Sequence, residues 1–261
     1  MLQSVSDELM DYFSSLFTYD IPPEVIAVQQ KSYVTYTLGS FPFDDQLCPE
    51  ITLLEARNLI SGAGTTGLRT WDAALHLGNY LFANKKLIEG KSVLELGAGP
   101  GYVSILCAKY LKAAHVIASD GSDDVVAELP TNFFINGLQD TTHIVAKELK
   151  WGHALLGGEH PEWNEGRPID IVIGADITYD DSVLGKLVGT FDELFTLYPK
   201  VTILIAAAVR NPTTLEKFVG ICHIKKFTIK EENIPIMQSI DQKGPFYSNK
   251  VPMVIYHISR L

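Results

Sequence analysis

The stretch Val93-Leu94-Glu95-Leu96-Gly97-Ala98-Gly99-Pro100-Gly101 decides the fold of this chain. A short apolar run ends in three glycines at alternate positions, and residues at helical spacing follow from Ser104 to Leu111. This order predicts a buried strand, a tight turn and a helix whose free N–H groups point toward a ligand. Glycine suits the turn because a Cβ would keep a ligand away from the backbone, although a purely structural turn could use the same residues. The dinucleotide-binding spacing is not met, because Tyr102 stands where its last glycine belongs.

From residue 92 onward, strand-like and helix-like patterns alternate. Seven strands with mostly helical crossovers predict an α/β fold with a doubly wound, mostly parallel sheet. The last two strands are joined by a segment without a helical pattern, which predicts an antiparallel C-terminal hairpin. The strands are expected at 92–96, 115–119, 143–145, 169–174, 201–207, 224–230 and 251–258, and the main helices at 71–83, 122–136, 182–196 and 212–222.

The N-terminal part reads differently. Leu2, Val5, Leu9, Phe13 and Leu16 recur at helical spacing and predict an amphipathic helix. We interpret 1–45 as a helical extension and 46–261 as the main domain. The apolar side of this helix either covers core, which we favour, or helps to dock a protein substrate.

Composition narrows the class of protein. The chain has 261 residues, enough for a substantial core, and a net charge of −10, which argues against binding to nucleic-acid phosphates. An acidic enzyme that acts on a basic protein segment fits better. Three scattered cysteines and seven histidines without ligand spacing indicate reduced thiols inside the cell and no metal site. We expect neither a signal peptide nor a membrane anchor, and a cytoplasmic location.

Three residues outside the glycine turn suggest how a nucleotide-like ligand is held. Asp120 ends the second strand of the sheet and can accept hydrogen bonds from both ribose hydroxyls. Trp151 follows the third and offers a flat face to an adenine ring, although a core or surface tryptophan is the alternative. Trp71 ends a loop rich in glycine and threonine at 61–71, which is either a helix cap or a lid over a cofactor.

The fourth strand ends in Ala175-Asp176-Ile177-Thr178-Tyr179. A carboxylate at the end of an apolar strand is costly unless it has a partner, so Asp176 is expected to be functional. A carboxylate beside an aromatic wall can hold a lysine ammonium before it loses its proton. The alternative is a helix cap, a role that Asp180 or Asp181 would serve better.

These residues give the chain its resemblance to a known family. The segments 65–74 and 93–99, Trp151 and the D-x-x-Y motif Asp176-Ile177-Thr178-Tyr179 resemble the family-16 seven-strand protein-lysine methyltransferases. Within that family the chain is most similar to the elongation factor 2 lysine methyltransferases, through 65–74 and Ala208-Val209-Arg210-Asn211-Pro212-Thr213-Thr214-Leu215.

The resemblance implies a Rossmann-like class I methyltransferase domain and S-adenosyl-L-methionine as the methyl donor, with S-adenosyl-L-homocysteine as the product. Asp176 and Tyr179 would line the lysine channel, and Arg210 and Asn211 would shape its substrate side without being catalytic. The implied partner is elongation factor 2, methylated on a lysine by a monomeric cytoplasmic enzyme. The residues expected to contact the donor are Trp71, Gly97, Ala98, Gly99, Asp120, Trp151 and Ala175.

Three other functions stay open at this point. The acceptor could be another protein lysine or a small-molecule amine, although the D-x-x-Y motif favours protein lysine. A nucleic-acid methyltransferase would want an N/D-P-P-Y-type loop and a basic face, which this acidic chain lacks. A cofactor-binding module without catalysis is the third alternative.

Overall fold

A computed structural model describes residues 6–17, 30–39, 49–58, 65–139, 142–153, 155, 164, 166–232, 234, 236–238 and 240–260. Its helices are α1 (Asp7–Leu16), α3 (Asp72–Ala83), the short 3-10 helix η1 (Lys85–Leu87), α4 (Tyr102–Lys109), α5 (Asp123–Ile135), α6 (Asp181–Leu197) and α7 (Pro212–Ile224). Its strands are β1 (Ser32–Thr37), β2 (Glu50–Glu55), β3 (Ser92–Leu96), β4 (His115–Asp120), β5 (Ile144–Glu148), β6 (Ile171–Ala175), β7 (Thr202–Ala208), β8 (Phe227–Glu232) and β9 (Met253–Arg260).

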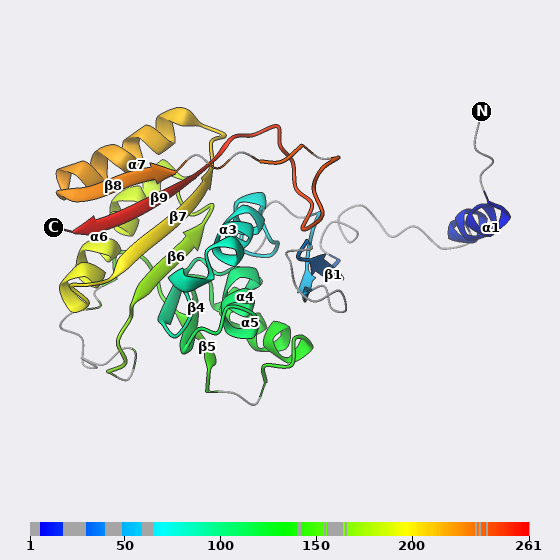
Figure 1. The fold of residues 1–261 in the computed structure, drawn as a ribbon, viewed down its shortest axis with the longest axis horizontal. Helices are drawn as coiled ribbons and strands as arrows, with labels where there is room; N and C mark the ends of the chain where they lie inside the picture. Colours follow the sequence, from blue (N-terminus) through cyan, green and yellow to red (C-terminus); the bar gives the residue numbers. More distant parts are fainter. Residues whose placement is uncertain are drawn as a thin grey trace.

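The main sheet has seven strands in the order β5-β4-β3-β6-β7-β9-β8 (Figure 1). Strands β3 to β7 pair in parallel, and β9 runs antiparallel to both of its neighbours. The glycine-turn strand β3 lies in the middle of the parallel strands, with Val93 between Val116 and Ile171. The chain order reverses on either side of β3, and in open α/β sheets such a switch point is where ligands bind. The predicted doubly wound sheet with an antiparallel C-terminal hairpin is confirmed.

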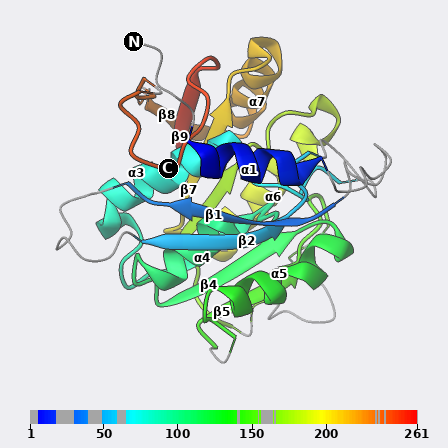
Figure 2. The ribbon, with the colours of Figure 1, turned by 90° about the vertical axis from the view of Figure 1, so that its right-hand side faces the viewer.

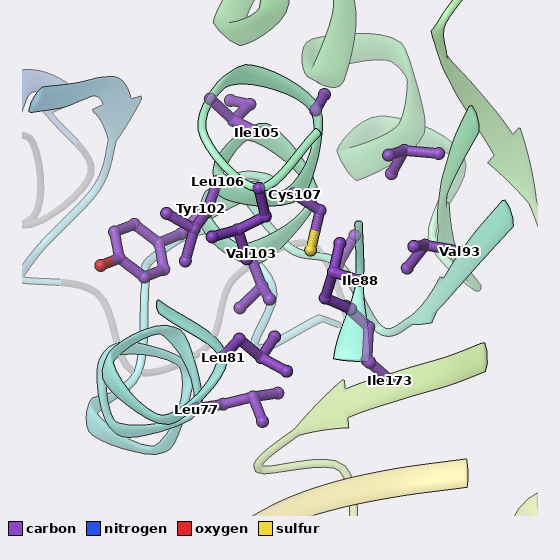
Figure 3. Close-up of a cluster of buried hydrophobic side chains, with 14 of the residues drawn as sticks. Leu77, Leu81, Ile88, Val93, Tyr102, Val103, Ile105, Leu106, Cys107 and Ile173 are labelled. Carbon is purple, nitrogen blue, oxygen red and sulfur yellow. The ribbon is translucent and has the colours of Figure 1, made fainter. Parts of the chain in front are cut away.

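Helices cover both faces of this sheet. On one face α3, α4 and α5 form a continuous apolar core with the sheet, and on the other face α6 and α7 form a second core. Figure 3 shows part of the first core, to which Leu81 of α3, Leu106 of α4 and Val93 and Ile173 of the sheet contribute. Each central strand therefore buries both of its faces, which explains why β3 and β4 read as nearly unbroken apolar runs.

The sequence predicts a short strand at 51–54, which the structure confirms as β2, but it does not predict the pairing of this strand with β1 outside the main sheet. Strand β1 pairs antiparallel with β2, and β2 lies beside α4 and α5 (Figure 2). Two side chains of the α5 region bind the backbone of β2. Asn132 Oδ1 accepts a hydrogen bond from Leu54 N at 2.8 Å, and Asn136 Oδ1 accepts one from Thr52 N at 3.2 Å. Tyr36 of β1 is buried in the first core. The domain boundary at residue 45 stays a prediction, and β1 pairs with β2 across it.

Helix α1 forms where the sequence predicts it, with Ser6 Oγ accepting from Leu9 N at 3.2 Å. None of its residues is buried, and it is drawn apart from the sheet in Figure 1. Its apolar side chains are exposed, and Phe13 packs edge to face against Phe17, the exposed residue that follows the helix. The expectation that the apolar side of this helix covers core is therefore wrong.

Two further expectations can be compared with the structure. Strand β8 begins at Phe227 and not at 224, because α7 continues to Ile224, whose side chain is 80% exposed and has no core to join. Cys107 and Cys222 are buried free thiols, as expected, whereas Cys48 lies outside the described residues. Among the described helices, none is both long and apolar enough to span a membrane.

Candidate functional site

A cleft of about 1270 Å³ opens at the carboxyl edge of the sheet. It is bounded by the residues that follow β3, β4, β5, β6 and β7, and by the segment 65–71 that leads into α3. The nine residues expected to contact the donor or to line the lysine channel all line this one cleft: Trp71, Gly97, Ala98, Gly99, Asp120, Trp151, Ala175, Asp176 and Tyr179. The structure therefore brings together the expected donor and acceptor residues, which are spread over more than a hundred positions of the chain.

The glycine turn after β3 needs glycine for two physical reasons. Gly97 and Gly99 have φ of +68° and +53°, a backbone region that residues with a Cβ rarely adopt. A Cβ on Gly97 would lie 2.7 Å from Ile177 Cγ2, and one on Gly99 would lie 3.3 Å from the carbonyl oxygen of Gly67. The turn therefore packs closely against the residues after β6 and the segment before α3, and its backbone lines the cleft.

Asp120 at the end of β4 holds the same turn. Its Oδ2 accepts a hydrogen bond from Gly99 N at 3.1 Å, and its Oδ1 accepts one from Ser122 N at 3.0 Å. Burial raises the pKa of the Asp120 carboxyl, and the hydrogen bonds from backbone N–H groups lower it in part. A carboxylate offers about four lone-pair positions, and the backbone N–H of Gly121 also bonds to it, so one remains for a hydroxyl donor in the cleft.

Glu95 is a second acid of the cleft, to which sequence reasoning gave no separate role. It is 2% exposed, and its Oε2 accepts hydrogen bonds from the backbone N (2.8 Å) and the hydroxyl of Ser104 at the start of α4. Burial raises the pKa of Glu95 to about 8, so the group is protonated at neutral pH. An acid inside an apolar strand was the signal that could have found it.

Trp151 lies beside the glycine turn. Its Cζ2 atom is 3.6 Å from the position that a Cβ on Gly97 would occupy, and its ring is half-buried against the second core. The predicted neighbourhood of Trp151 and the glycine turn is therefore present in the structure. Contact between the indole and an adenine ring stays a prediction.

Asp176 follows β6 and is 8% exposed, with φ of +53°, which is uncommon for a residue with a Cβ. Its Oδ1 accepts from Ala208 N at 3.0 Å, and its Oδ2 accepts from Arg210 Nη2 at 3.0 Å. The carboxylate thus joins the ends of β6 and β7 and holds a guanidinium in the cleft. The helix-cap alternative is excluded, because Asp180 caps α6 through Ser182 N at 2.8 Å.

The ion pair of Asp176 and Arg210 was not predicted. The two residues are 34 positions apart, and no local pattern links them. The resemblance placed Arg210 and Asn211 on the substrate side of the site without giving either one a partner. In the structure Arg210 does line the cleft, whereas Asn211 is the N-cap of α7, where its Oδ1 accepts from Thr213 N.

The segment 65–71 forms the wall opposite the sheet. Tyr179, 55% exposed, shares a hydrogen bond of 3.0 Å between its hydroxyl and Thr66 Oγ1, and Trp71 Nε1 donates to Thr66 O at 3.0 Å. The guanidinium carbons of Arg69 and Arg210 lie 4.8 and 5.3 Å from the centroid of the Trp71 ring, within cation–π range. Thr66 therefore links the predicted donor residue Trp71 to the predicted acceptor residue Tyr179, a role that sequence reasoning missed.

A buried carboxylate anchors this wall. Glu55, at the end of β2, is 1% exposed, and its Oε2 accepts from Thr70 N at 2.8 Å and from Thr70 Oγ1 at 2.7 Å. Its Oε1 accepts from the Tyr36 hydroxyl at 2.6 Å. The hairpin of β1 and β2 thus positions the start of α3, and with it Trp71, over the cleft.

The fold and the site define a class I methyltransferase: a seven-stranded sheet with an antiparallel next-to-edge strand β9, a glycine turn after β3 and an acid at the end of β4. A solved S-adenosylmethionine-dependent methyltransferase from Aquifex aeolicus has the same fold, with a TM-score of 0.50, 15% identity, and coverage of 71% of this chain and 90% of that one. Residues 54–222 match the lysine methyltransferase family. The chain belongs to this family.

Its relatives include named enzymes. The chain is 51% identical over 256 residues to the protein-lysine N-methyltransferase EFM3 of Chaetomium thermophilum, covering 98% of this chain and 76% of that protein. It is 34% identical to EFM3 of Saccharomyces cerevisiae and 32% identical to the human protein-lysine N-methyltransferase EEF2KMT, covering 70% and 64% of this chain. The chain spans little more than half the length of these two relatives, 56% and 53%.

Proposed function

We propose that this chain transfers methyl groups from S-adenosyl-L-methionine to a lysine side chain of elongation factor 2 in the cytoplasm. One observation carries the proposal: the residues expected on the donor side and those expected on the acceptor side line a single cleft at the switch point of the sheet. The cleft volume of about 1270 Å³ leaves room for a nucleoside-sized ligand and a lysine side chain together.

The donor side fits the proposed cofactor. The backbone of Gly97 and Gly99 lines the cleft, and the carboxylate of Asp120 keeps lone-pair capacity for a ribose hydroxyl. Trp151 stands beside the turn with a flat face for an uncharged base. When bound, S-adenosyl-L-methionine supplies an electrophilic methyl group on a sulfonium centre. The protein residues bind the nucleoside part and fix its orientation.

The acceptor side fits a lysine. Asp176 uses two of its lone-pair positions for Ala208 N and Arg210, so it can accept a further hydrogen bond from an incoming amine. Tyr179 adds an aromatic wall and a hydroxyl at the mouth of the cleft. A lysine arrives as an ammonium and must lose a proton before it attacks, and the role of these two residues is to hold the amine while that happens.

Two further observations support a protein lysine as the acceptor and elongation factor 2 as its source. The chain is a member of the lysine methyltransferase family, and the relatives reported above carry the name protein-lysine N-methyltransferase. The segments 65–74 and 208–215 resemble the elongation factor 2 subgroup, and the structure brings both to the cleft, through Thr66 and Trp71 of the first and Arg210 of the second.

The test is transfer of label from S-adenosyl-L-methionine to purified elongation factor 2, with mass spectrometry of the labelled peptide. We expect one methylated lysine with the unaltered chain and a loss of at least a hundredfold in rate with Asp176→Ala. Asp241→Ala, which changes an exposed acid outside the cleft, is the matched control and should keep full activity. Label on other proteins of a cell extract but none on elongation factor 2 would refute the acceptor, and no labelled protein at all would refute a protein substrate.

A further inference from the structure

A second, smaller cavity of about 390 Å³ lies between α7 and the antiparallel strands of the sheet. We call it the α7 groove. Its walls are apolar side chains of α7 and β9, and two carboxylates flank them; the residues that matter here are Leu215, Val219, Val254, Tyr256, Glu216 and Glu231.

The α7 groove and the functional cleft are lined by consecutive residues of the chain. Val209 lines the groove, and the next residue, Arg210, lines the cleft and pairs with Asp176. Val209 is fixed at this place by a hydrogen bond from its N to the carbonyl oxygen of Pro252 at 2.9 Å. Helix α7 starts at Pro212, directly after the cleft, and runs beside β8 and β9 (Figure 1). The loop between β7 and α7 therefore contributes to both cavities.

The chemistry of the α7 groove selects for an apolar group next to a cation. Leu215 and Val219 offer an aliphatic wall, while Glu216 is exposed and has no ion-pair partner among the residues that the structure describes. Glu231 keeps its place through a hydrogen bond with Tyr256, its neighbour across the strand pair. Two carboxylates at the rim would repel phosphate groups and attract lysine or arginine.

We propose that the α7 groove binds the protein substrate beside its acceptor lysine, taking one aliphatic side chain and an adjacent basic residue. This inference rests on the proposed function. Strands in a sheet are about 4.8 Å apart, so β9 and β8 lie about 10 and 14 Å across the sheet from β6, where Asp176 stands. An extended peptide advances about 3.3 Å per residue. The aliphatic residue is therefore about three positions from the acceptor lysine, and the basic residue about four.

A symmetric probe tests this placement in either chain direction. The probe is the fluorescein-labelled peptide Arg-Leu-Ser-Ser-Lys-Ser-Ser-Leu-Arg, and its binding to the full chain is followed by fluorescence anisotropy with S-adenosyl-L-homocysteine present to prevent turnover. Replacing both leucines with serine should weaken binding about tenfold, since a buried aliphatic side chain is lost. Replacing both arginines with glutamate should weaken it at least fivefold. Equal affinities for the three peptides, or no measurable binding of the probe, would overturn the proposal.

Variants of the protein test whether the probe binds in the α7 groove. Glu216→Lys should weaken binding of the arginine probe at least fivefold, and Val219→Trp, which fills the groove, should remove the preference for leucine over serine. The matched control is Glu89→Lys, an exposed glutamate next to η1 that lines neither cavity. Thermal unfolding of each variant verifies that it is folded. Equal effects of Glu216→Lys and Glu89→Lys would contradict the groove as the binding site.

The failure of this inference is distinguishable from the failure of the proposed function. If the chain methylates elongation factor 2 and Glu216→Lys leaves KM unchanged, the groove has no role in substrate binding while the function stands. If elongation factor 2 is not methylated, but the preference for the leucine and arginine peptide still depends on Glu216 and Val219, the groove is a substrate-binding site and the acceptor is another protein. When both hold, we expect Glu216→Lys to raise KM at least fivefold with kcat unchanged.

Discussion

Replacing Glu95 with glutamine is expected to remove a large pH dependence from the stability of this fold. Glu95 is 2% exposed beneath the glycine turn, and Oε2 is its only atom that accepts the two hydrogen bonds from Ser104. Glutamine has nearly the same shape and keeps one acceptor oxygen for both bonds. The substitution therefore changes the ability to titrate more than it changes the packing.

The size of the effect follows from the two pKa values of Glu95. Burial raises its pKa to about 8 in the folded chain from an ordinary 4.5. Below pH 4.5 the carboxyl is protonated in both states, so stability is unaffected there. Between about 4.5 and 8 the unfolded chain releases the proton and the folded chain keeps it, so the free energy of unfolding falls by about 1.4 kcal/mol per pH unit, in total about 5 kcal/mol. A loss of that size is comparable with the whole stability of an ordinary domain.

Urea unfolding at several pH values measures this quantity, with tryptophan fluorescence or circular dichroism as the signal. We expect the unaltered chain to lose stability steadily from pH 5 to pH 8 and Glu95→Gln to lose far less, so that the difference between them grows by about 4 kcal/mol. Asp120 also has a raised pKa and is present in both proteins, so only its charge interaction with Glu95, the smallest cause of the raised Glu95 pKa, enters the difference. Glu89→Gln, at an exposed position, is the matched control and should follow the unaltered chain.

The result that would refute the reasoning is a parallel pH dependence for the unaltered chain and Glu95→Gln. It would mean that Glu95 is ionised in the folded protein, with a cation or water compensating its burial. A variant that is equally destabilised at every pH would instead indicate that glutamine does not fit, and Glu95→Met, which has a similar volume and cannot titrate, then separates packing from charge.

Three other substitutions test the site. Gly97→Ala places a Cβ 2.7 Å from Ile177 Cγ2 at a φ of +68°. We expect urea unfolding to show a loss of about 1–2 kcal/mol in stability, and calorimetry to show no binding of S-adenosyl-L-homocysteine. Unchanged binding would contradict the proposed place of the donor. Asp120→Asn keeps the size but not the charge of the group that faces the ribose, so donor affinity should fall about tenfold, and an unaltered affinity would exclude this role. Arg210→Ala frees Asp176 Oδ2, so we expect kcat for lysine methylation to fall about tenfold at constant donor affinity; a fall in donor affinity instead would place Arg210 on the donor side.

Local patterns were sufficient for much of the fold. The strand before Gly97 is buried on both faces, so its apolar run was visible without any partner, and the helical crossovers implied parallel strands. The carboxyl ends of parallel strands lie at one edge of a sheet, which is why Asp120 and Asp176 could be assigned to one site from the order of the strands alone.

The hairpin and the helix at the N-terminus show where local patterns fail. Strand β1 has one exposed face and a mixed pattern, and its partner β2 comes after a long connection. The place of β2 depends in turn on contacts with α5 such as Asn132 to Leu54. Helix α1 has the apolar side that normally covers core, but periodicity specifies a helix face and not what lies against it.

The sequence by itself determined the class of fold, the glycine turn and the acids at the strand ends, because backbone conformation and burial pattern are set over a few neighbouring residues. The tertiary structure alone decided that Asp176 pairs with Arg210 and that Thr66 links Trp71 to Tyr179. It also decided that apolar side chains of α7 and β9 form a groove with two carboxylates beside it. Each of these depends on the distance between side chains that are far apart in the chain, and only the packing of the sheet and its helices sets that distance.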